Sequence, residues 1–442
     1  MVPSDEVRYK KYGCLESGEK MKLGLSAFLA LFVVSSAAAQ STAWKSQQLP
    51  MTRMSGLLRL VETIPVPTEG YMDRMAIDLK GQRLFICGEA AKSLLVVDLR
   101  EGKVIHETKG LAEMPKKAFY LPGSNEIWLT LTNSSVVVIS GATYDVTKTI
   151  ELSAYGDPNR GADNAAYDPA RHLLYAGVEA FVSGNNVEKG GGGAHVADKA
   201  SIEVVDTRDA KLLASIKLPG GDPSGMAFEP SGKHMYVAMG DVIGGESHTE
   251  VIDLEKRAVV AEWPITGGPV PHAAAVDEAH HRLFVASRMI PHEGQLGGGH
   301  QHEPGKLVVM DTETGKVTQA LDSIGGSDNV DFDPASGRIY VTGTTGTVAV
   351  FQEVDPDHVE LLGKVPTGAL AKSGLWVPEQ KRFYSAVPRH YVLTPPRASH
   401  DIYSDLSKEL AVVESGAQGK NLPILSNLIV EEAHLMVFEF AE

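Results

Sequence analysis

Cysteine is almost absent from this chain, which has only Cys14 and Cys87 among its 442 residues. Two cysteines cannot build a disulfide scaffold, a multi-cysteine zinc site or the Cys-x-x-Cys-His attachment site of covalent haem. Positive charge is also scarce, because 41 Lys and Arg face 56 Asp and Glu, for a net charge of -15. Sequence-independent binding to nucleic acid needs a basic face. We therefore expect no nucleic-acid partner and no covalent haem.

A long apolar run is missing as well. Residues 23–34 are apolar, but such a run is too short for a comfortable membrane span. Lys20 and Lys22 precede it, and an Ala-x-Ala ending closes at Ala39, which is typical of a secretory signal peptide over residues 21–39. We expect a periplasmic or secreted protein without stable membrane insertion after cleavage. Residues 1–20 are then a mis-assigned start extension before Met21, and residues 40–55 are a linker.

The familiar catalytic motifs are missing too. The sequence has no Gly-x-Ser-x-Gly elbow, no His-Glu-x-x-His and no phosphate-binding Gly-x-x-x-x-Gly-Lys-Ser/Thr. The glycines at 190–193 are not followed by a helix pattern, and Cys87 ends an apolar strand, where a small core residue is expected. These absences favour a protein that is not an enzyme.

Glycine, in contrast, is abundant at 44 residues, which indicates many turns. The chain repeats one plan, seen in DPARHLLYAG (168–177), DEAHHRLFVAS (277–287) and DPASGRIYVTG (333–343). Short β-branched or aromatic runs bounded by turn formers indicate strands. Equivalent first-turn positions are Asp78, Leu121, Asp168, Glu229, Asp277, Asp333 and Val377. A four-stranded unit recurring about every 40 to 45 residues predicts an all-β, seven-bladed β-propeller over residues 56–442.

The last blade lacks a fourth strand of its own, because its third, residues 434–440, runs to the end of the sequence. Residues 58–66 (LRLVETIPV) precede the first blade and match a fourth strand. Pairing between the two would close the ring and remove an exposed sheet edge. We therefore predict closure of the last blade by the amino-terminal strand.

The repeats resemble a known family. MYVAM (235–239), IYVTG (339–343) and the x-Val-Val-Asp runs look like the YVTN repeats of YncE-like seven-bladed propellers. GADNAAYDPA (161–170) and DPDHVELLGKVPT (355–367) resemble exported members that have no assigned reaction. The resemblance implies an extracytoplasmic binding or scaffold propeller. The wider quinoprotein amine dehydrogenase-like superfamily also contains lactonases, so the fold does not select a function.

Four long insertions between second and third strands are predicted to lie on one face of the ring, at residues 178–200, 240–248, 288–306 and 388–433. Long loops on a rigid scaffold commonly carry binding function. One of them contains His292, His300 and His302, whose imidazoles suit zinc, copper or nickel. A solvated polar loop remains the alternative.

A second candidate site comes from the repeat register. Polar residues stand where each first strand begins, at the mouth of the central channel: Asp73, Lys116, Asp163, Ser224, His272, Asp328 and Lys372, followed in some blades by Arg74, Asn164 or Asn329. Such a ring suits a cation held by oxygen ligands or a small polar molecule. Alternatively, these positions are polar because water reaches them and because Asp and Asn cap turns.

Three functions remain open at this point. The first is an exported, non-enzymatic propeller that binds a small ligand or a protein on its insertion-bearing face. The second is a metal-dependent, lactonase-like hydrolase that uses Asp163, Asn164, His272, Asp328 and Asn329 at the channel mouth. The third is transition-metal binding by the histidine-rich loop. The cofactor is unknown, with a divalent metal as the candidate.

Overall fold

The structure, a computed structural model, describes residues 57–180, 199–219, 221–240, 247–268, 270–288, 305–368, 370–393 and 428–440. All of these belong to one compact unit, Met51–Glu442, which is separate from Met1–Pro50. The predicted start at Met21, the signal peptide and the linker lie outside the described residues. No helix within the described ranges is long and apolar enough to cross a membrane.

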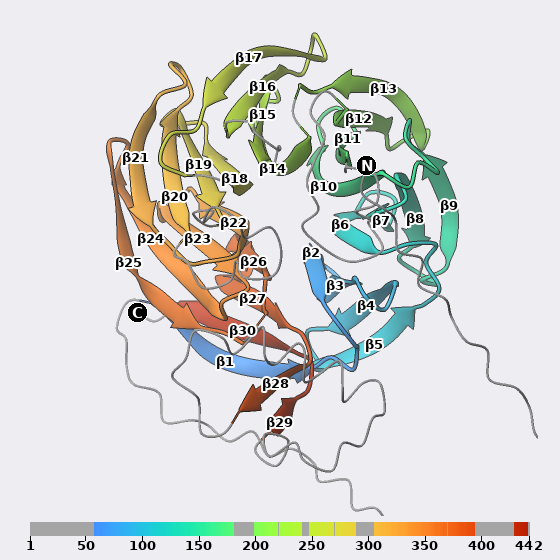
Figure 1. Ribbon diagram of the computed structural model, residues 1–442. Helices are drawn as coiled ribbons and strands as arrows, with labels where there is room; N and C mark the ends of the chain where they lie inside the picture. Colours follow the sequence, from blue (N-terminus) through green and yellow to red (C-terminus); the bar gives the residue numbers. More distant parts are fainter. Residues whose placement is uncertain are drawn as a thin grey trace, which may run out of the picture. The chain divides into compact units, whose positions relative to one another are not determined.

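Seven four-stranded antiparallel sheets form the fold (Figure 1), as the repeats predict. Blades one to three are β2 (Met72–Asp78), β3 (Arg83–Gly88), β4 (Ser93–Asp98), β5 (Lys103–Thr108); β6 (Pro115–Leu121), β7 (Glu126–Leu131), β8 (Ser135–Ser140), β9 (Val146–Glu151); and β10 (Arg160–Asp168), β11 (Leu173–Ala180), β12 (Ser201–Asp206), β13 (Lys211–Lys217). Blades four to six are β14 (Asp222–Phe228), β15 (His234–Gly240), β16 (His248–Asp253), β17 (Ala258–Pro264); β18 (Pro271–Asp277), β19 (Arg282–Ser287), β20 (Lys306–Asp311), β21 (Val317–Asp322); and β22 (Ser327–Asp333), β23 (Arg338–Gly343), β24 (Thr347–Asp355), β25 (His358–Pro366). Blade seven is β26 (Ser373–Val377), β27 (Arg382–Val387), β30 (His434–Phe440) and β1 (Leu58–Pro65).

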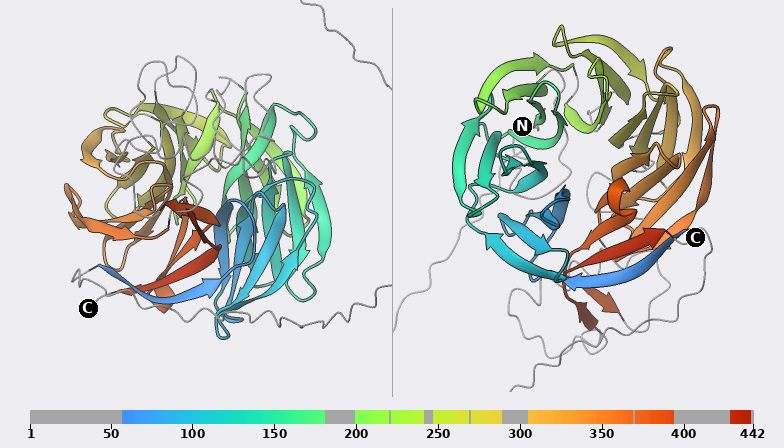
Figure 2. Two further views of the ribbon diagram at one scale, coloured as in Figure 1. Left: turned by 60° about the horizontal axis from the view of Figure 1, so that its bottom comes forward. Right: turned by 180° about the vertical axis from the view of Figure 1, so that it is seen from behind.

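The amino-terminal strand closes the ring, and this prediction is confirmed. β1 pairs antiparallel with β30 from Leu58↔Phe440 to Pro65↔His434, so the two ends of the described chain share one sheet. The first strand of each blade contacts the first strands of both neighbouring blades. Seen from the front and from behind, these strands surround the axis of the ring (Figures 1 and 2).

Packing between blades follows from the alternation of side chains along each strand. In β3, Leu84 and Ile86 pack toward blade seven, whereas Phe85 and Cys87 pack toward blade two. Seven apolar clusters result, one between each pair of neighbouring blades. Cys87 is fully buried, and burial raises the pKa of its thiol well above the ordinary value, which agrees with a core role.

The aspartates that end the third strands form turns, as predicted. Asp98 accepts the backbone N–H groups of Arg100 and Glu101, each through Oδ1. The same pattern recurs in three other blades at Asp206, Asp253 and Asp311. A side chain that satisfies the backbone two and three residues ahead stabilises a tight turn. These carboxylates are therefore structural.

Most of each predicted insertion lies outside the described residues, including His292, His300 and His302. The last insertion, 388–433, begins and ends in strands that the repeat pattern did not predict. β28 (His390–Leu393) pairs with β29 (Leu428–Glu431), with His390 opposite Glu431. The two ends of this insertion are thus held together beside blade seven (Figure 1).

Closure by β1 can be tested at Ile64, which is 1% exposed and packs between blades seven and one. Replacing Ile64 with Ala should lower the free energy of unfolding by about 2–5 kcal/mol, because it removes buried methyl groups and leaves a cavity. The matched control is Arg59→Ala on the same strand. Arg59 is largely exposed and reaches Glu439 only at 3.6 Å, so its loss should cost about 1 kcal/mol or less. Urea unfolding measures both, and equal effects would contradict closure through β1.

Candidate functional site

The polar positions predicted at the channel mouth do lie together, around the axis where the innermost strands begin. We call Asp73, Lys116, Asp163, Ser224, His272, Asp328 and Lys372 the axial ring. In six blades the pairing of first and second strands shifts register at this point. The shift leaves Lys116, His272 and Asp328 without a partner in the ladder, and in blade one it leaves Arg74. A β-bulge re-aims the side chain that it carries.

Asp73 is the centre of the first charged group. It is fully buried, and its Oδ2 lies 2.9 Å from Lys372 Nζ and 3.2 Å from Lys116 Nζ. Arg74 Nη1 lies 3.6 Å from Asp73 Oδ1 and 3.2 Å from Asp163 Oδ1. Ion pairs therefore link blades one, two, three and seven across the axis.

Glu89 belongs to the same group. Lys116 Nζ lies 2.8 Å from Glu89 Oε1, and Lys372 Nζ lies 2.8 Å from Oε2. Burial alone would raise the pKa of Glu89, but the two ammonium groups outweigh burial and lower that pKa to about 2. Burial likewise opposes ionisation of Asp163, yet Arg74 and then Lys116 hold its pKa well below the ordinary range. Both carboxylates are thus ionised at neutral pH.

The second charged group lies at blades five and six. Asp328 Oδ1 is 3.0 Å from His272 Nε2 and 2.5 Å from Arg288 Nη2. Burial, and then the nearby Arg288 guanidinium, lower the pKa of His272 despite the Asp328 carboxylate. The imidazole is therefore neutral at neutral pH, and Arg288 supplies the positive charge.

The remaining predicted residues connect blades through the backbone. Asn164 Nδ2 donates to the Ser224 carbonyl at 2.6 Å, which joins blades three and four. Asn329 Nδ2 donates to the Gly374 carbonyl at 3.1 Å, which joins blades six and seven. Ser224 Oγ donates to Asp222. The two amides join neighbouring blades, whereas the Ser224 hydroxyl bonds within its own strand, β14.

Two further charged side chains, Lys117 and Asp331, lie next to the axial ring. Lys117 directly follows Lys116, and Asp331 stands three residues after Asp328. Enclosure by protein shifts the pKa of both side chains. Burial lowers the pKa of Lys117 to about 8 and raises that of Asp331 to about 7. Asp331 accepts a hydrogen bond from Asn329 at 2.9 Å. Full charge is therefore less stable at these positions than in the ion-paired ring.

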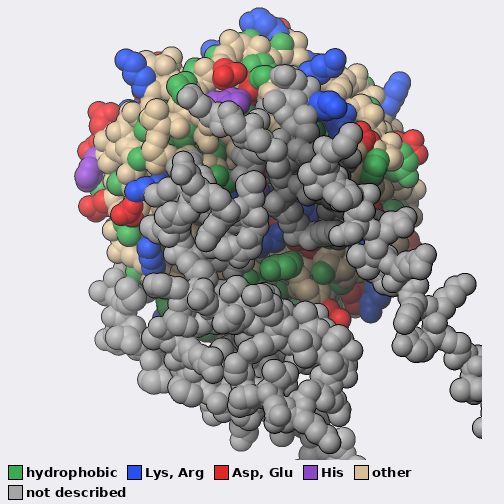
Figure 3. All heavy atoms as spheres, in the orientation of Figure 1, with side chains coloured by type: hydrophobic (Ala, Val, Ile, Leu, Met, Phe, Trp, Pro, Cys, Tyr) green, Lys and Arg blue, Asp and Glu red, His purple; other side chains and the backbone are tan. Residues whose placement is uncertain are grey.

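Charge is layered at the ring. The carboxylates are all nearly enclosed, with side chains 0% exposed in Asp73, 2% in Asp328, 7% in Glu89 and 9% in Asp163. Three of the four cations reach closer to solvent, at 13%, 17% and 30% for Lys372, Lys116 and Arg288, whereas Arg74 is buried with the acids. On the outer rim seen in Figure 3, side chains of both signs are intermixed. The charged area that the axial ring exposes therefore comes mainly from cations, on a protein that is acidic overall.

Sequence reasoning missed Glu89 and Arg288. Each follows the last residue of a second strand, β3 or β19, and so returns to the end of the blade where the first strand begins. In an antiparallel blade, the end of the second strand lies beside the start of the first strand. The position after each second strand therefore lies beside the ring positions.

Comparisons with known proteins agree with this fold. No protein-family model matches the chain. Over 88 residues, 20% of this chain, it is 32% identical to the uncharacterized protein YncE of Salmonella typhi, and the match covers 24% of that protein. The resemblance of the repeats to YncE is thus confirmed over part of the chain.

Solved structures share the fold over a longer range. Hydrazine synthase of Kuenenia stuttgartiensis has a TM-score of 0.57 and 18% identity, covering 73% of this chain and 93% of that one. A chain in the crystal structure of the mitotic checkpoint complex has a TM-score of 0.58 and 11% identity, covering 79% and 94%. At such identities the similarity shows the propeller fold alone.

The ion pairs of Glu89 predict a pH dependence. Its pKa is about 2 in the folded protein, below the ordinary value of 4.5, so its contribution to stability is complete above the ordinary value and is lost as pH falls toward 2. The free energy of unfolding should fall between about pH 5 and pH 2. In Glu89→Gln this slope should be shallower, because one titrating group is gone. Urea unfolding across this range measures it, and an unchanged slope would show that Glu89 is not paired.

Proposed function

We propose that this protein is a non-catalytic, exported propeller whose axial ring binds a small anionic molecule, such as a carboxylate or a phosphate. The observation that carries the proposal is the layering of charge. Lys372, Lys116 and Arg288 are 13%, 17% and 30% exposed, whereas the carboxylates that pair with them are 9% exposed or less. An anion approaching this end of the axis meets ammonium and guanidinium groups first.

Spare hydrogen-bond donors support the same ligand class. Arg74 is 2% exposed, and its Nε and Nη2 meet no hydrogen-bond partner among the described residues. Buried donors are rarely left without acceptors. Guanidinium groups recognise carboxylate and phosphate oxygens through paired hydrogen bonds. Arg74 thus adds donors next to the cations that face solvent.

The pairing of the carboxylates counts against metal-dependent hydrolysis at the axial ring. Asp163 faces Arg74 and Lys116, and Asp328 faces Arg288, so the charge that would bind a divalent cation is already balanced by the protein's own cations. The amide oxygen of Asn164, which would be the metal ligand, accepts the backbone N–H of Ala165 at 2.9 Å. The leader pattern at residues 21–39 supports the exported location.

The test is a titration of the full chain with inorganic phosphate and with citrate, followed by isothermal calorimetry against sodium chloride of matched ionic strength. At least one of the two anions should bind. Arg288→Gln should weaken binding about tenfold or more, because a charge-assisted hydrogen bond contributes about 1.5–3 kcal/mol.

The matched control is Arg59→Gln, which removes an equal charge from the outer strand β1 and should leave the affinity unchanged. Absence of binding by both anions, or equal losses in the two variants, would refute an anion site at the axial ring. Turnover of an ester or lactone that depends on Asp163 or His272 would replace the proposal with the hydrolase alternative.

A further inference from the structure

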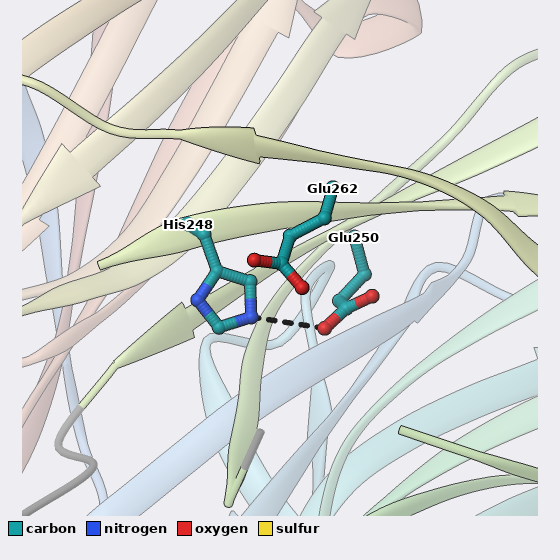
Figure 4. A group of neighbouring side chains, drawn as sticks. All are labelled: His248, Glu250 and Glu262. Atoms are coloured by element: carbon teal, nitrogen blue, oxygen red, sulfur yellow. Dashed lines mark hydrogen bonds and ion pairs between the residues drawn. The ribbon is translucent and has the colours of Figure 1, made fainter. Parts of the chain in front are cut away.

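Blade four carries a second cluster of polar side chains, on its two outer strands. His248 and Glu250 are two residues apart in β16 and so lie on the same face. Glu262 of β17 is the direct cross-strand partner of Glu250. Figure 4 shows the three side chains converging, with His248 Nε2 2.9 Å from Glu250 Oε1. One ligand atom from each residue lies within 4.8 Å of the others.

Glu250 is fully buried, although it carries a carboxylate. Its face of β16 packs toward blade three, because Ile252 on the same face belongs to the cluster between blades three and four. The second carboxylate oxygen, Oε2, is enclosed and meets no hydrogen-bond donor in the described part of the chain. A buried carboxylate in this state is costly unless a cation balances it.

The fold does not require an acid at this position. Counting back three residues from the aspartate that ends each third strand leads to Glu250 in blade four. The same count leads to Leu95 in blade one and Val308 in blade five, both fully buried. An aliphatic side chain therefore satisfies the packing, and the carboxylate needs a reason of its own.

Blade three provides an internal comparison, because its residue at the same position is Glu203, also fully buried. Three serine hydroxyls donate to Glu203 Oε1, each at 2.7 Å: Ser153, Ser201 and Ser215. The backbone N–H of Ser153 lies 3.3 Å from Oε2. Here the protein stabilises the buried carboxylate with three hydroxyl donors, and Ser201 Oγ in turn accepts a hydrogen bond from Arg160 Nη2 at 2.8 Å.

At the equivalent positions around Glu250, none of the three serines is kept. His248 stands at the position of Ser201, and Glu262 stands at that of Ser215. Leu152 and Leu218 are equivalent, because each donates its N–H to the carbonyl of the residue before the third strand of its blade. The residue after Leu152 is Ser153, whereas the residue after Leu218 is Pro219, which has no N–H to donate. Glu250 therefore lacks the hydroxyl donors that surround Glu203. Its neighbours are instead an imidazole, that of His248, and a second carboxylate, that of Glu262. Such an exchange suits a bound cation.

We propose that His248, Glu250 and Glu262 bind one divalent transition-metal ion of the zinc type. One imidazole nitrogen and two carboxylate oxygens are ligands that zinc accepts, and a fourth position stays available for water. Metal–ligand bonds of about 2.0–2.2 Å place tetrahedral ligands about 3.4 Å apart, within reach of the present spacing. Glu262 is exposed, which opens the site to solvent.

This site is independent of the axial ring and of the predicted histidine loop. It lies on β16 and β17, the outer strands of blade four, whereas the axial ring lies on the innermost strands. It shares no residue with His292, His300 and His302. It therefore stands whether or not the ring binds an anion.

The experiment is a zinc chloride titration of the full chain after treatment with a chelator, with stoichiometry and affinity from calorimetry. Glu250→Gln should lose one equivalent of zinc, or bind it about tenfold more weakly at least, and should lose the zinc-dependent rise in Tm. The matched control is Glu203→Gln, which removes the equivalent buried carboxylate of blade three and should keep the equivalent. Cobalt(II) provides a spectroscopic measure, since its visible absorption should change in Glu250→Gln and persist in Glu203→Gln.

Two further variants test the site even if Glu250→Gln does not fold. Glu262→Gln changes an exposed side chain and should weaken zinc binding similarly. Glu250→Leu copies blade one and should fold without binding the ion. Unchanged zinc binding in Glu262→Gln or in folded Glu250→Leu would overturn the proposal, as would an equal loss in Glu203→Gln.

Discussion

Packing between neighbouring blades is the constraint on which the rest of the structure depends. No blade has a core of its own, because alternate side chains of each strand pack toward opposite neighbours, as Leu84 and Phe85 do in blade one. A ring of such sheets must close, since an open end would expose an apolar face. Pairing of β1 with β30 closes it and joins the two ends of the described chain in one blade. The rigid frame then holds polar side chains at the axis in fixed positions.

The same frame encloses charged side chains at the axis, so their charges must be balanced by other side chains. Innermost strands converge there, and bulges aim side chains such as Lys116 and Asp328 inward. Enclosed charges are stable only when paired. The protein pairs them across blades, so that Asp73 meets cations from blades two and seven. Lys117 and Asp331 lie beside the ring with fewer opposite charges around them. Burial lowers the pKa of Lys117 and raises that of Asp331, so the neutral form of each is favoured.

Much of the fold could be predicted from the sequence, because a short pattern that recurs seven times defines the number and order of the blades. Strand three of blade seven and the turn aspartates follow directly from the repeat plan. The polar ring also follows, because each ring residue stands at a fixed distance from a turn. Partners could not be predicted in this way: Arg288 meets Asp328 only after the chain has crossed a blade boundary. Such contacts depend on how neighbouring blades are placed, which no single repeat contains.

Differences between equivalent positions are therefore more informative than the repeat itself. Buried Glu203 and buried Glu250 occupy the same place in adjacent blades, where other blades use Leu95 or Val308. Three serine hydroxyls donate to Glu203, whereas Glu250 meets His248 Nε2 at 2.9 Å and its Oε2 has no donor among the described residues. Since both glutamates are fully buried at equivalent strand positions, the contrast lies in their neighbouring side chains. Around Glu250 those neighbours are one imidazole and a second carboxylate, and a divalent cation bound by all three side chains would balance their charge.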